Sequence, residues 1–167
     1  QVIAVHASPT GTNINVRAGS EHVRRQVSDI GALIRQSEAD FGLAFDGDAD
    51  RVVFVDEKGS LIDGDHMLGM LANYFHEQNR LLGGAVVTTV MRNSGLKNRL
   101  EQFGIEMFET PVGDKYVTEK LMALRAENGY SGVSIGVGGE QSGHIIILDN
   151  THLTGDGMRT ALYVMRV

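Results

Sequence analysis

The chain has 167 residues, of which 42% are hydrophobic, so it can form one globular domain or two small ones. A formal net charge of −6 without a basic run argues against a nucleic-acid partner, and no stretch approaches the roughly 20 apolar residues that span a bilayer. The absence of cysteine excludes disulfides and thiolate metal sites. We therefore expect a cytoplasmic protein that binds neither nucleic acid nor membrane.

The first part of the chain alternates between short apolar runs and a helical pattern. The expected strands are residues 2–7, 41–45, 52–55 and 60–62. The last two predict a hairpin that turns at residues 57–59. Between the first two strands, apolar residues recur at helical spacing, at Val23, Val27, Ile30 and Ile34. We expect Ser20 to be the N-cap of this helix.

The second part of the chain repeats the alternation of strands and helices. The expected strands are residues 85–90, 105–109, 133–137 and 145–148. The expected helices are residues 67–75, 96–103, 116–126 and 158–167. Gly104 is placed to end the second of these helices, and Asp156 is placed to cap the last. The pattern indicates an α/β fold of two units, residues 1–64 and 65–167, with mixed sheets flanked by helices.

The stretch FDGDADRVVFV places three carboxylates at alternate positions, at Asp46, Asp48 and Asp50, directly before Arg51. Like charges this close raise the free energy of ionising one another, so the pattern needs a compensating charge. In a nearly extended loop the three side chains can face one point, and hard oxygen ligands suit Mg²⁺ or Ca²⁺. We expect a metal site here, with Arg51 beside it to bind a phosphate group.

Two other interpretations of this loop remain. The spacing also matches an EF-hand, but position 6 of that motif should be glycine and is Arg51, and the flanking runs are typical of strands rather than helices. A solvated turn without a ligand is the second, because Asp and Gly favour turns.

A glycine-rich stretch, GGEQSGH, carries a second set of polar groups. Glu140, Ser142 and His144 share parity, so an acceptor, a hydroxyl and an imidazole can project to one side and hold sugar hydroxyls. An ordinary hairpin loop between two strands is the alternative, because short glycine motifs are weak evidence.

The stretch TPVGDKY places Lys115 at the expected start of a helix. A cation there is unfavourable for the helix dipole, whereas backbone N–H groups and an ammonium together suit an anion such as phosphate. The alternative is a solvated lysine after a turn.

In this order, the three motifs resemble those of the α-D-phosphohexomutases, and the resemblance covers essentially the whole chain. DGDADR resembles the family's metal-binding loop, PVGDKY its lysine segment and GEQSGH its sugar-binding loop. The segments GTNIN at 11–15 and THLTGDG at 151–157 resemble the branch that acts on glucosamine phosphates. Ala18 and Leu153 depart from that branch, which weakens the assignment of the substrate but not of the catalytic residues.

The resemblance implies a Mg²⁺-dependent isomerase that moves a phosphoryl group between the 6 and 1 positions of a phosphorylated hexose or hexosamine, through a phosphoserine enzyme and a bisphosphate intermediate. The three aspartates would bind Mg²⁺. Arg51, Lys115 and His144 would be catalytic, and Glu140 and Ser142 would bind the substrate.

The resemblance also implies that this chain supplies domains 2 and 3 of a four-domain enzyme. Neither the serine loop that carries the phosphate nor the loop that holds the distal phosphate is recognisable here, so we expect the chain alone to lack mutase activity. Domain 2 also lacks its expected first strand and helix. The uncovered sheet edge makes a homodimer possible.

Two other functions remain open. One is a phosphoglucomutase or phosphomannomutase with the same machinery, against which the GTNIN segment argues. The other is a non-catalytic module that binds Ca²⁺ or a sugar.

Overall fold

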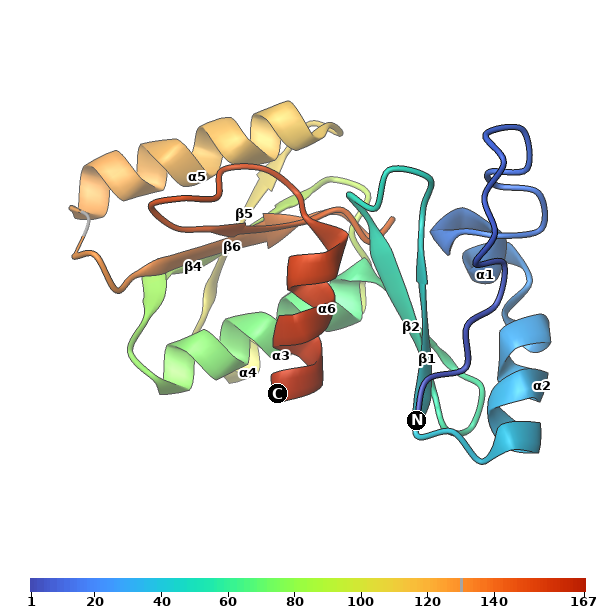
Figure 1. Ribbon diagram of the computed structural model, residues 1–167. Helices are drawn as coiled ribbons and strands as arrows, with labels where there is room; N and C mark the ends of the chain where they lie inside the picture. Colours follow the sequence, from blue (N-terminus) through green and yellow to red (C-terminus); the bar gives the residue numbers. More distant parts are fainter. Residues whose placement is uncertain (130) are drawn as a thin grey trace.

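The computed structural model describes residues 1–129 and 131–167, and it contains two β-sheets with helices around them (Figure 1). A three-stranded sheet has the order β1-β2-β3, and a four-stranded sheet has the order β5-β4-β6-β7. The α/β class expected from the sequence is confirmed. No helix in the described part of the chain is long and apolar enough to cross a bilayer.

The first sheet is an antiparallel meander of β1 (Phe41–Phe45), β2 (Val52–Asp56) and β3 (Leu61–Ile62). Helices α1 (Ser20–Arg25) and α2 (Val27–Ser37) cover its outer face (Figure 1). Strand β2 is buried on both faces, because Val53 and Val55 pack under these helices while Val52 and Phe54 face the other way. This explains why VVFV is continuously apolar rather than alternating.

The second sheet is mixed. Strands β4 (Leu81–Thr89), β5 (Glu106–Thr110) and β6 (Ile135–Gly139) are parallel, and β7 (Ile145–Leu148) runs antiparallel to β6. Helix α5 (Asp114–Asn128) packs on one face, while α3 (Gly64–Glu77) and α4 (Ser94–Gln102) lie on the other (Figure 1).

Helix α6 (Gly157–Arg166) joins the two sheets, because it contacts β1 and β2 of the first and β7 of the second. A single apolar cluster accordingly runs from β2 through α3 and α6 to the second sheet. It includes Val52 and Phe54 on β2, Phe75 on α3 and Ile145 on β7. The loops at the ends of these elements are therefore held by one continuous core.

The strand expected at residues 2–7 is wrong. This segment has no regular structure, and its apolar side chains are exposed, with Val2 at 90% and Val5 at 56%. A strand needs a neighbour for its backbone hydrogen bonds, and among the described residues β1 pairs only with β2. The composition of the segment suits a strand, but within the described residues it pairs with no strand.

The single helix expected to begin after Ser20 is also wrong in detail. Gln26 has non-helical dihedral angles and separates α1 from α2, so the apolar positions lie on two helices. The N-cap is Gly19 with φ of 94°, whereas Ser20 is the first helical residue and is buried. A Cβ at Gly19 would lie 3.0 Å from Asn15 Oδ1, so the close approach as well as the backbone angle favours glycine.

The remaining elements lie within a few residues of their expected positions. Gly104 has φ of 70° directly after the cap of α4, as the end of that helix requires. Asp156 caps α6 by accepting a hydrogen bond from the Arg159 backbone. The acidic loop lies between β1 and β2, so its flanks are strands, which excludes the helix–loop–helix context of an EF-hand.

We expect Gly64→Ala to destabilise the protein by about 1–3 kcal/mol, as overpacking does. A Cβ at Gly64, the first residue of α3, would lie 1.9 Å from the backbone oxygen of Glu140. Gly69→Ala in the same helix is the control, because its Cβ would meet nothing closer than 3.6 Å, and the change adds about 1 kcal/mol of helix propensity. Urea unfolding measures both; equal stabilities would contradict the contact between α3 and the glycine-rich loop.

Candidate active site

The acidic loop gathers its three carboxylates as the sequence predicts. One oxygen from each of Asp46, Asp48 and Asp50 lies within 4.8 Å of the others. The turn that brings them together includes Ala49 in the left-handed region, with φ of 59°, and a backbone hydrogen bond from Ala49 N to Asp46 O. Asp48 is exposed, whereas Asp46 and Asp50 are partly buried.

The electrostatics of this cluster favour a bound cation. Burial, and next the adjacent Asp50 carboxylate, raise the pKa of Asp46, while the backbone N–H and the charge of Arg51 oppose the shift. Arg51 Nε lies 3.6 Å from Asp46 Oδ2 and 3.9 Å from Asp50 Oδ1, too far for good hydrogen bonds. Asp50 Oδ1 is buried and accepts no hydrogen bond from any described residue. An oxygen-rich set with one unpaired buried oxygen fits a hard divalent cation such as Mg²⁺.

The glycine-rich loop lies against the acidic loop. Arg51 and His144 form an antiparallel bridge, and Val52 N donates to Gly143 O at 3.1 Å. This pairing places His144 Nδ1 3.0 Å from Asp50 Oδ2. Gly143 is required here, because a Cβ would lie 2.2 Å from the Val52 oxygen. Two motifs about 90 residues apart in the sequence thus form one site.

The loop before α6 completes this arrangement. A Cβ on Gly155 would lie 2.2 Å from His144 Nε2, so this glycine packs directly on the imidazole. Gly157 N donates to Ala49 O at 2.9 Å, inside the acidic loop. The capping role expected for Asp156 is confirmed, and the loop around it also touches both other motifs.

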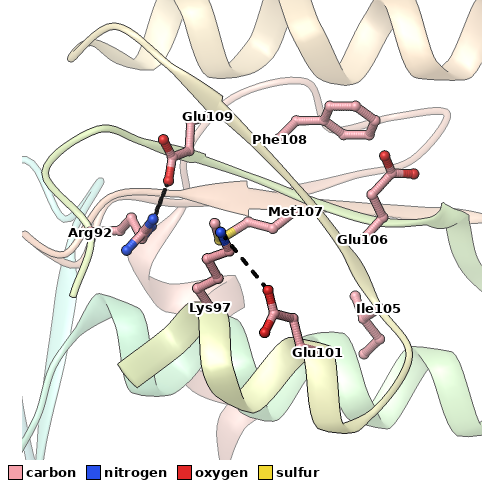
Figure 2. A pocket seen from close by; sticks show the side chains of 8 residues that line it. All are labelled: Arg92, Lys97, Glu101, Ile105, Glu106, Met107, Phe108 and Glu109. Atoms are coloured by element: carbon pink, nitrogen blue, oxygen red, sulfur yellow. Dashed lines mark hydrogen bonds and ion pairs between the residues drawn. The ribbon is translucent and has the colours of Figure 1, made fainter. Parts of the chain in front are cut away.

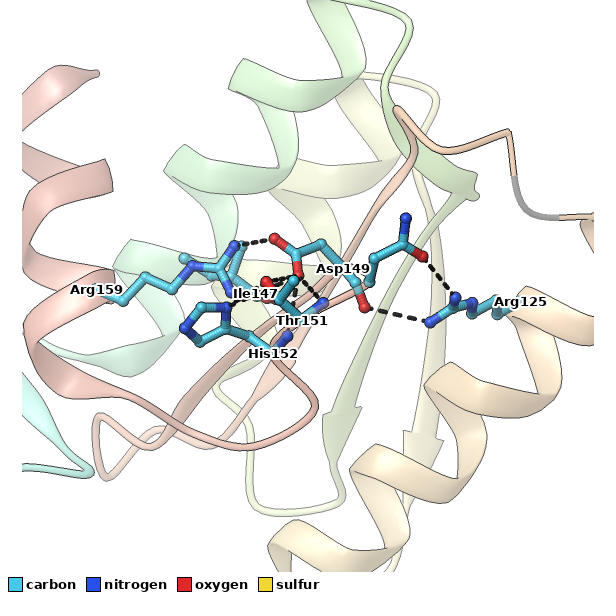
Figure 3. A network of polar contacts seen from close by, with 7 residues as sticks. Arg125, Ile147, Asp149, Thr151, His152 and Arg159 are labelled. Carbon is cyan, nitrogen blue, oxygen red and sulfur yellow. Dashed lines mark hydrogen bonds and ion pairs between the residues drawn. The ribbon is translucent and has the colours of Figure 1, made fainter.

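A polar network holds the start of this loop (Figure 3). Arg159 on α6 donates to the Ile147 backbone and to Asp149 Oδ2, while Thr151 and His152 donate to Asp149 Oδ1. Arg125 on α5 donates to the Asp149 backbone oxygen and to Asn150. Burial acts to raise the pKa of Asp149, but the hydrogen bonds from Thr151, His152 and Arg159 outweigh it and hold that pKa well below its usual value.

Glu140 and Ser142 belong to the same glycine-rich loop as His144. Glu140 Oε1 accepts a hydrogen bond from Gly113 N at 2.9 Å, which joins the glycine-rich loop to the segment before α5. The Ser142 hydroxyl is buried and has no hydrogen-bond partner in the described parts of the chain. Its oxygen is therefore available to a ligand.

Lys115 lies in the first turn of α5, as expected. Its side chain is 74% exposed, and its Nζ is 3.8 Å from Glu119 Oε1. Gly113, two residues before Lys115, is bound to Glu140, but among the described residues no contact joins the Lys115 ammonium to the aspartates. The acidic and glycine-rich loops are thus in direct contact, whereas Lys115 is linked to them only along the chain, through Gly113.

Sequence reasoning did not identify the wall of the hollow beside the acidic loop. This hollow has a volume of about 430 Å³ and is lined by Asn15, Ala18, Ser20, Glu21, His22, Arg25, Asp46 and Arg51. A Cβ on Gly47 would lie 2.7 Å from Ile14, so the GTNIN segment packs on the acidic loop. The glycine–asparagine composition of that segment was the available signal, since such residues typically form loops near ligands.

A second hollow of about 550 Å³ lies at the exposed edge of β5, beside α4 (Figure 2). Four of its five charged groups are paired with one another, Arg92 with Glu109 and Lys97 with Glu101, and the fifth is Glu106. The larger volume therefore does not mark a better candidate, because its cationic side chains are already engaged.

Comparison with known proteins decides the family. The family model "Phosphoglucomutase/phosphomannomutase, alpha/beta/alpha domain III" matches residues 63–167, and the corresponding domain II model matches residues 1–59. The chain belongs to the α-D-phosphohexomutase family. The resemblance seen in the motifs is confirmed, as are the two domains to which the chain corresponds.

Curated relatives match the chain over its whole length. The phosphoglucosamine mutase of Caldicellulosiruptor bescii is 43% identical over 167 residues, covering 100% of this chain, and that of Geobacillus thermodenitrificans is 47% identical, covering 99%. The chain spans 34% of the length of each of these relatives. A phosphoglucomutase/phosphomannomutase family protein of Burkholderia thailandensis has a similar structure, with a TM-score of 0.72, 25% identity and coverage of 89% of this chain and 30% of that one.

We expect Asp149→Asn to remove a pH-dependent part of the stability. A lowered pKa in the folded state stabilises the protein above the unfolded value near 3.8, and the contribution is lost as the pH falls through the folded pKa. The variant should therefore be less stable than the wild type at pH 7, and the difference should shrink below about pH 4. Thermal unfolding across this range measures it. Asp40→Asn, at an exposed carboxylate, is the control; a difference that persists unchanged to pH 2 would contradict the network.

Proposed function

We propose that this chain forms the metal- and sugar-binding part of a phosphoglucosamine mutase, which interconverts glucosamine 6-phosphate and glucosamine 1-phosphate. The observation that carries the proposal is the contact between the acidic loop and the glycine-rich loop at Arg51 and His144. It brings the three aspartates of the proposed cation site close to the groups proposed to bind the sugar, and phosphoryl transfer depends on such positioning. The curated relatives that bear this name add support for the substrate.

Phosphoryl transfer depends on positioning and on neutralising charge. Mg²⁺, held by Asp46, Asp48 and Asp50, would supply positive charge to the oxygens of the transferring group. Arg51 is partly exposed and lies beside two of these carboxylates, so its guanidinium can hold a phosphate oxygen from the same side. Lys115 has an exposed ammonium at a helix start and would hold the phosphate or assist proton transfer.

The remaining groups would orient the sugar. Glu140 has one carboxylate oxygen bound to Gly113 N, which fixes the direction of the other, and Ser142 has an unpartnered hydroxyl. Both can hold sugar hydroxyls. His144 would act beside the reacting oxygen, next to Asp50.

The whole reaction would need the parts of the parent protein that lie outside this chain. We propose that they supply the phosphoserine and the loop for the distal phosphate, as domains 1 and 4. A cytoplasmic location and a homodimer stay predictions, which cell fractionation and analytical ultracentrifugation of the parent protein would test.

The decisive experiment measures turnover by the parent enzyme on the 6-phosphates of glucosamine, glucose and mannose. We expect glucosamine 6-phosphate to have the highest kcat/KM and the 167-residue chain to show no turnover of any of them. A preference for glucose or mannose would favour the second candidate, a phosphoglucomutase or phosphomannomutase, for which the Burkholderia thailandensis structure is an argument. Turnover by the chain alone would contradict the proposed division of parts.

We expect Asp48→Asn to weaken Mg²⁺ binding by at least about tenfold, a loss of about 1.4 kcal/mol, because one of the three ligand charges is removed. Isothermal titration calorimetry of the chain measures the affinity. Asp56→Asn is the control, because that carboxylate lies at the other end of β2 and binds the hairpin backbone at Lys58 and Ser60. Unchanged affinity in Asp48→Asn would contradict the metal site.

A further inference from the structure

His144 is a buried imidazole that faces the acidic loop. Its side chain is 8% exposed, and its Nδ1 lies 3.0 Å from Asp50 Oδ2. An ionised carboxylate only accepts hydrogen bonds, so a hydrogen bond in this pair would have Nδ1 as its donor. The pair joins a residue of the glycine-rich loop to one of the three proposed metal ligands.

The other ring nitrogen has a different environment. His144 Nε2 is buried and has no hydrogen-bond partner among residues 1–129 and 131–167. Gly155 occupies the space beside it, since a Cβ there would lie 2.2 Å from Nε2. A proton on Nε2 would be a buried donor without an acceptor, which costs free energy, so the neutral ring carries its proton on Nδ1. Within the described residues, the polar partner left to the ring in this arrangement is Asp50.

The two oxygens of Asp50 have different surroundings. Its Oδ2 lies 3.0 Å from His144 Nδ1, while its Oδ1 is buried without a hydrogen bond in the part of the chain that the structure describes. Arg51 Nε lies 3.9 Å from Oδ1. One oxygen thus faces a ring nitrogen, and the other is left for a cation.

We infer that His144 is a positioning residue for the metal site, which donates from Nδ1 to Asp50 Oδ2 and thereby presents Asp50 Oδ1 to the cation. This inference rests on the metal binding of the proposed function, and it assigns His144 a role through Asp50 in addition to any role at the sugar. Donors that fix a ligating carboxylate typically contribute 10–100-fold to metal affinity.

The loop before α6 holds the imidazole in place. Gly155 is paired with Ile146 of β7, and Gly157 N donates to Ala49 O at 2.9 Å. The network of Asp149 and Arg159 anchors the start of this loop to α6 (Figure 3). The ring is therefore clamped between Asp50 and a loop that is itself bound to the acidic loop.

The test compares His144→Ala with His144→Asn in the 167-residue chain, with Mn²⁺ as the probe because it takes the same oxygen ligands and its free form is read by electron paramagnetic resonance. The side-chain nitrogen of Asn can replace Nδ1 but not Nε2. We expect Ala to weaken Mn²⁺ binding by about 10–100-fold and Asn by less than about tenfold. A residue that acts only on the sugar or on a proton would leave Mn²⁺ binding unchanged in both variants, and that result would overturn the inference.

His66→Ala is the matched control. His66 Nδ1 makes the same kind of contact, 2.7 Å from Asp63 Oδ1, but it is exposed and Asp63 is not part of the metal cluster. Its loss should leave Mn²⁺ binding unchanged. Far-UV circular dichroism without metal shows whether each variant is folded.

A second measurement does not depend on any variant. Nitrogen-15 NMR of the histidine rings in the wild-type chain should show His144 with its proton on Nδ1, and a ring with its proton on Nε2 alone would overturn the inference. Failure of the proposed function gives a different result: wild-type chain and parent protein would both bind no Mn²⁺, whatever the tautomer of His144.

Discussion

The site depends on one backbone contact, the antiparallel bridge between Arg51 and His144. It is possible because β2 is buried on both faces, so the acidic loop at the start of β2 enters the core at a defined place. The second sheet supplies the partner from the turn between β6 and β7. The acidic loop and the glycine-rich loop are thereby held by the same cluster of apolar side chains. This cluster is rigid because protein interiors are close-packed.

Glycine makes these approaches possible. Gly64, Gly143, Gly155 and Gly157 each lie where a Cβ would come within 2.6 Å of an atom of another loop. Four of the 21 glycines are thus required by close contacts between segments of the site. The consequence is a site built from backbone proximity, in which the acidic loop lies directly against the glycine-rich loop.

Charge is the second constraint. Three carboxylates within 4.8 Å of one another are unfavourable without a cation. Burial, together with the adjacent Asp50, raises the pKa of Asp46. Arg51 offsets it only partly, since its Nε stays beyond hydrogen-bonding distance of both neighbours. The unfavourable charge interactions are confined to the acidic loop, whereas the loop before α6 is stabilised by the well-paired network of Asp149. Shifted pKa values of the kind seen at Asp46 are typical of functional sites.

The sequence alone determined the α/β class, the clustering of Asp46, Asp48 and Asp50, and the family, because alternation of apolar runs and short motifs are local properties. It failed at residues 2–7, which pair with no strand among the described residues, and at Gln26, where non-helical dihedral angles divide one apolar pattern between two helices that both contact β1 and β2. Only the tertiary structure placed His144 on Asp50 and Gly155 on His144, because these contacts join segments that no local pattern relates.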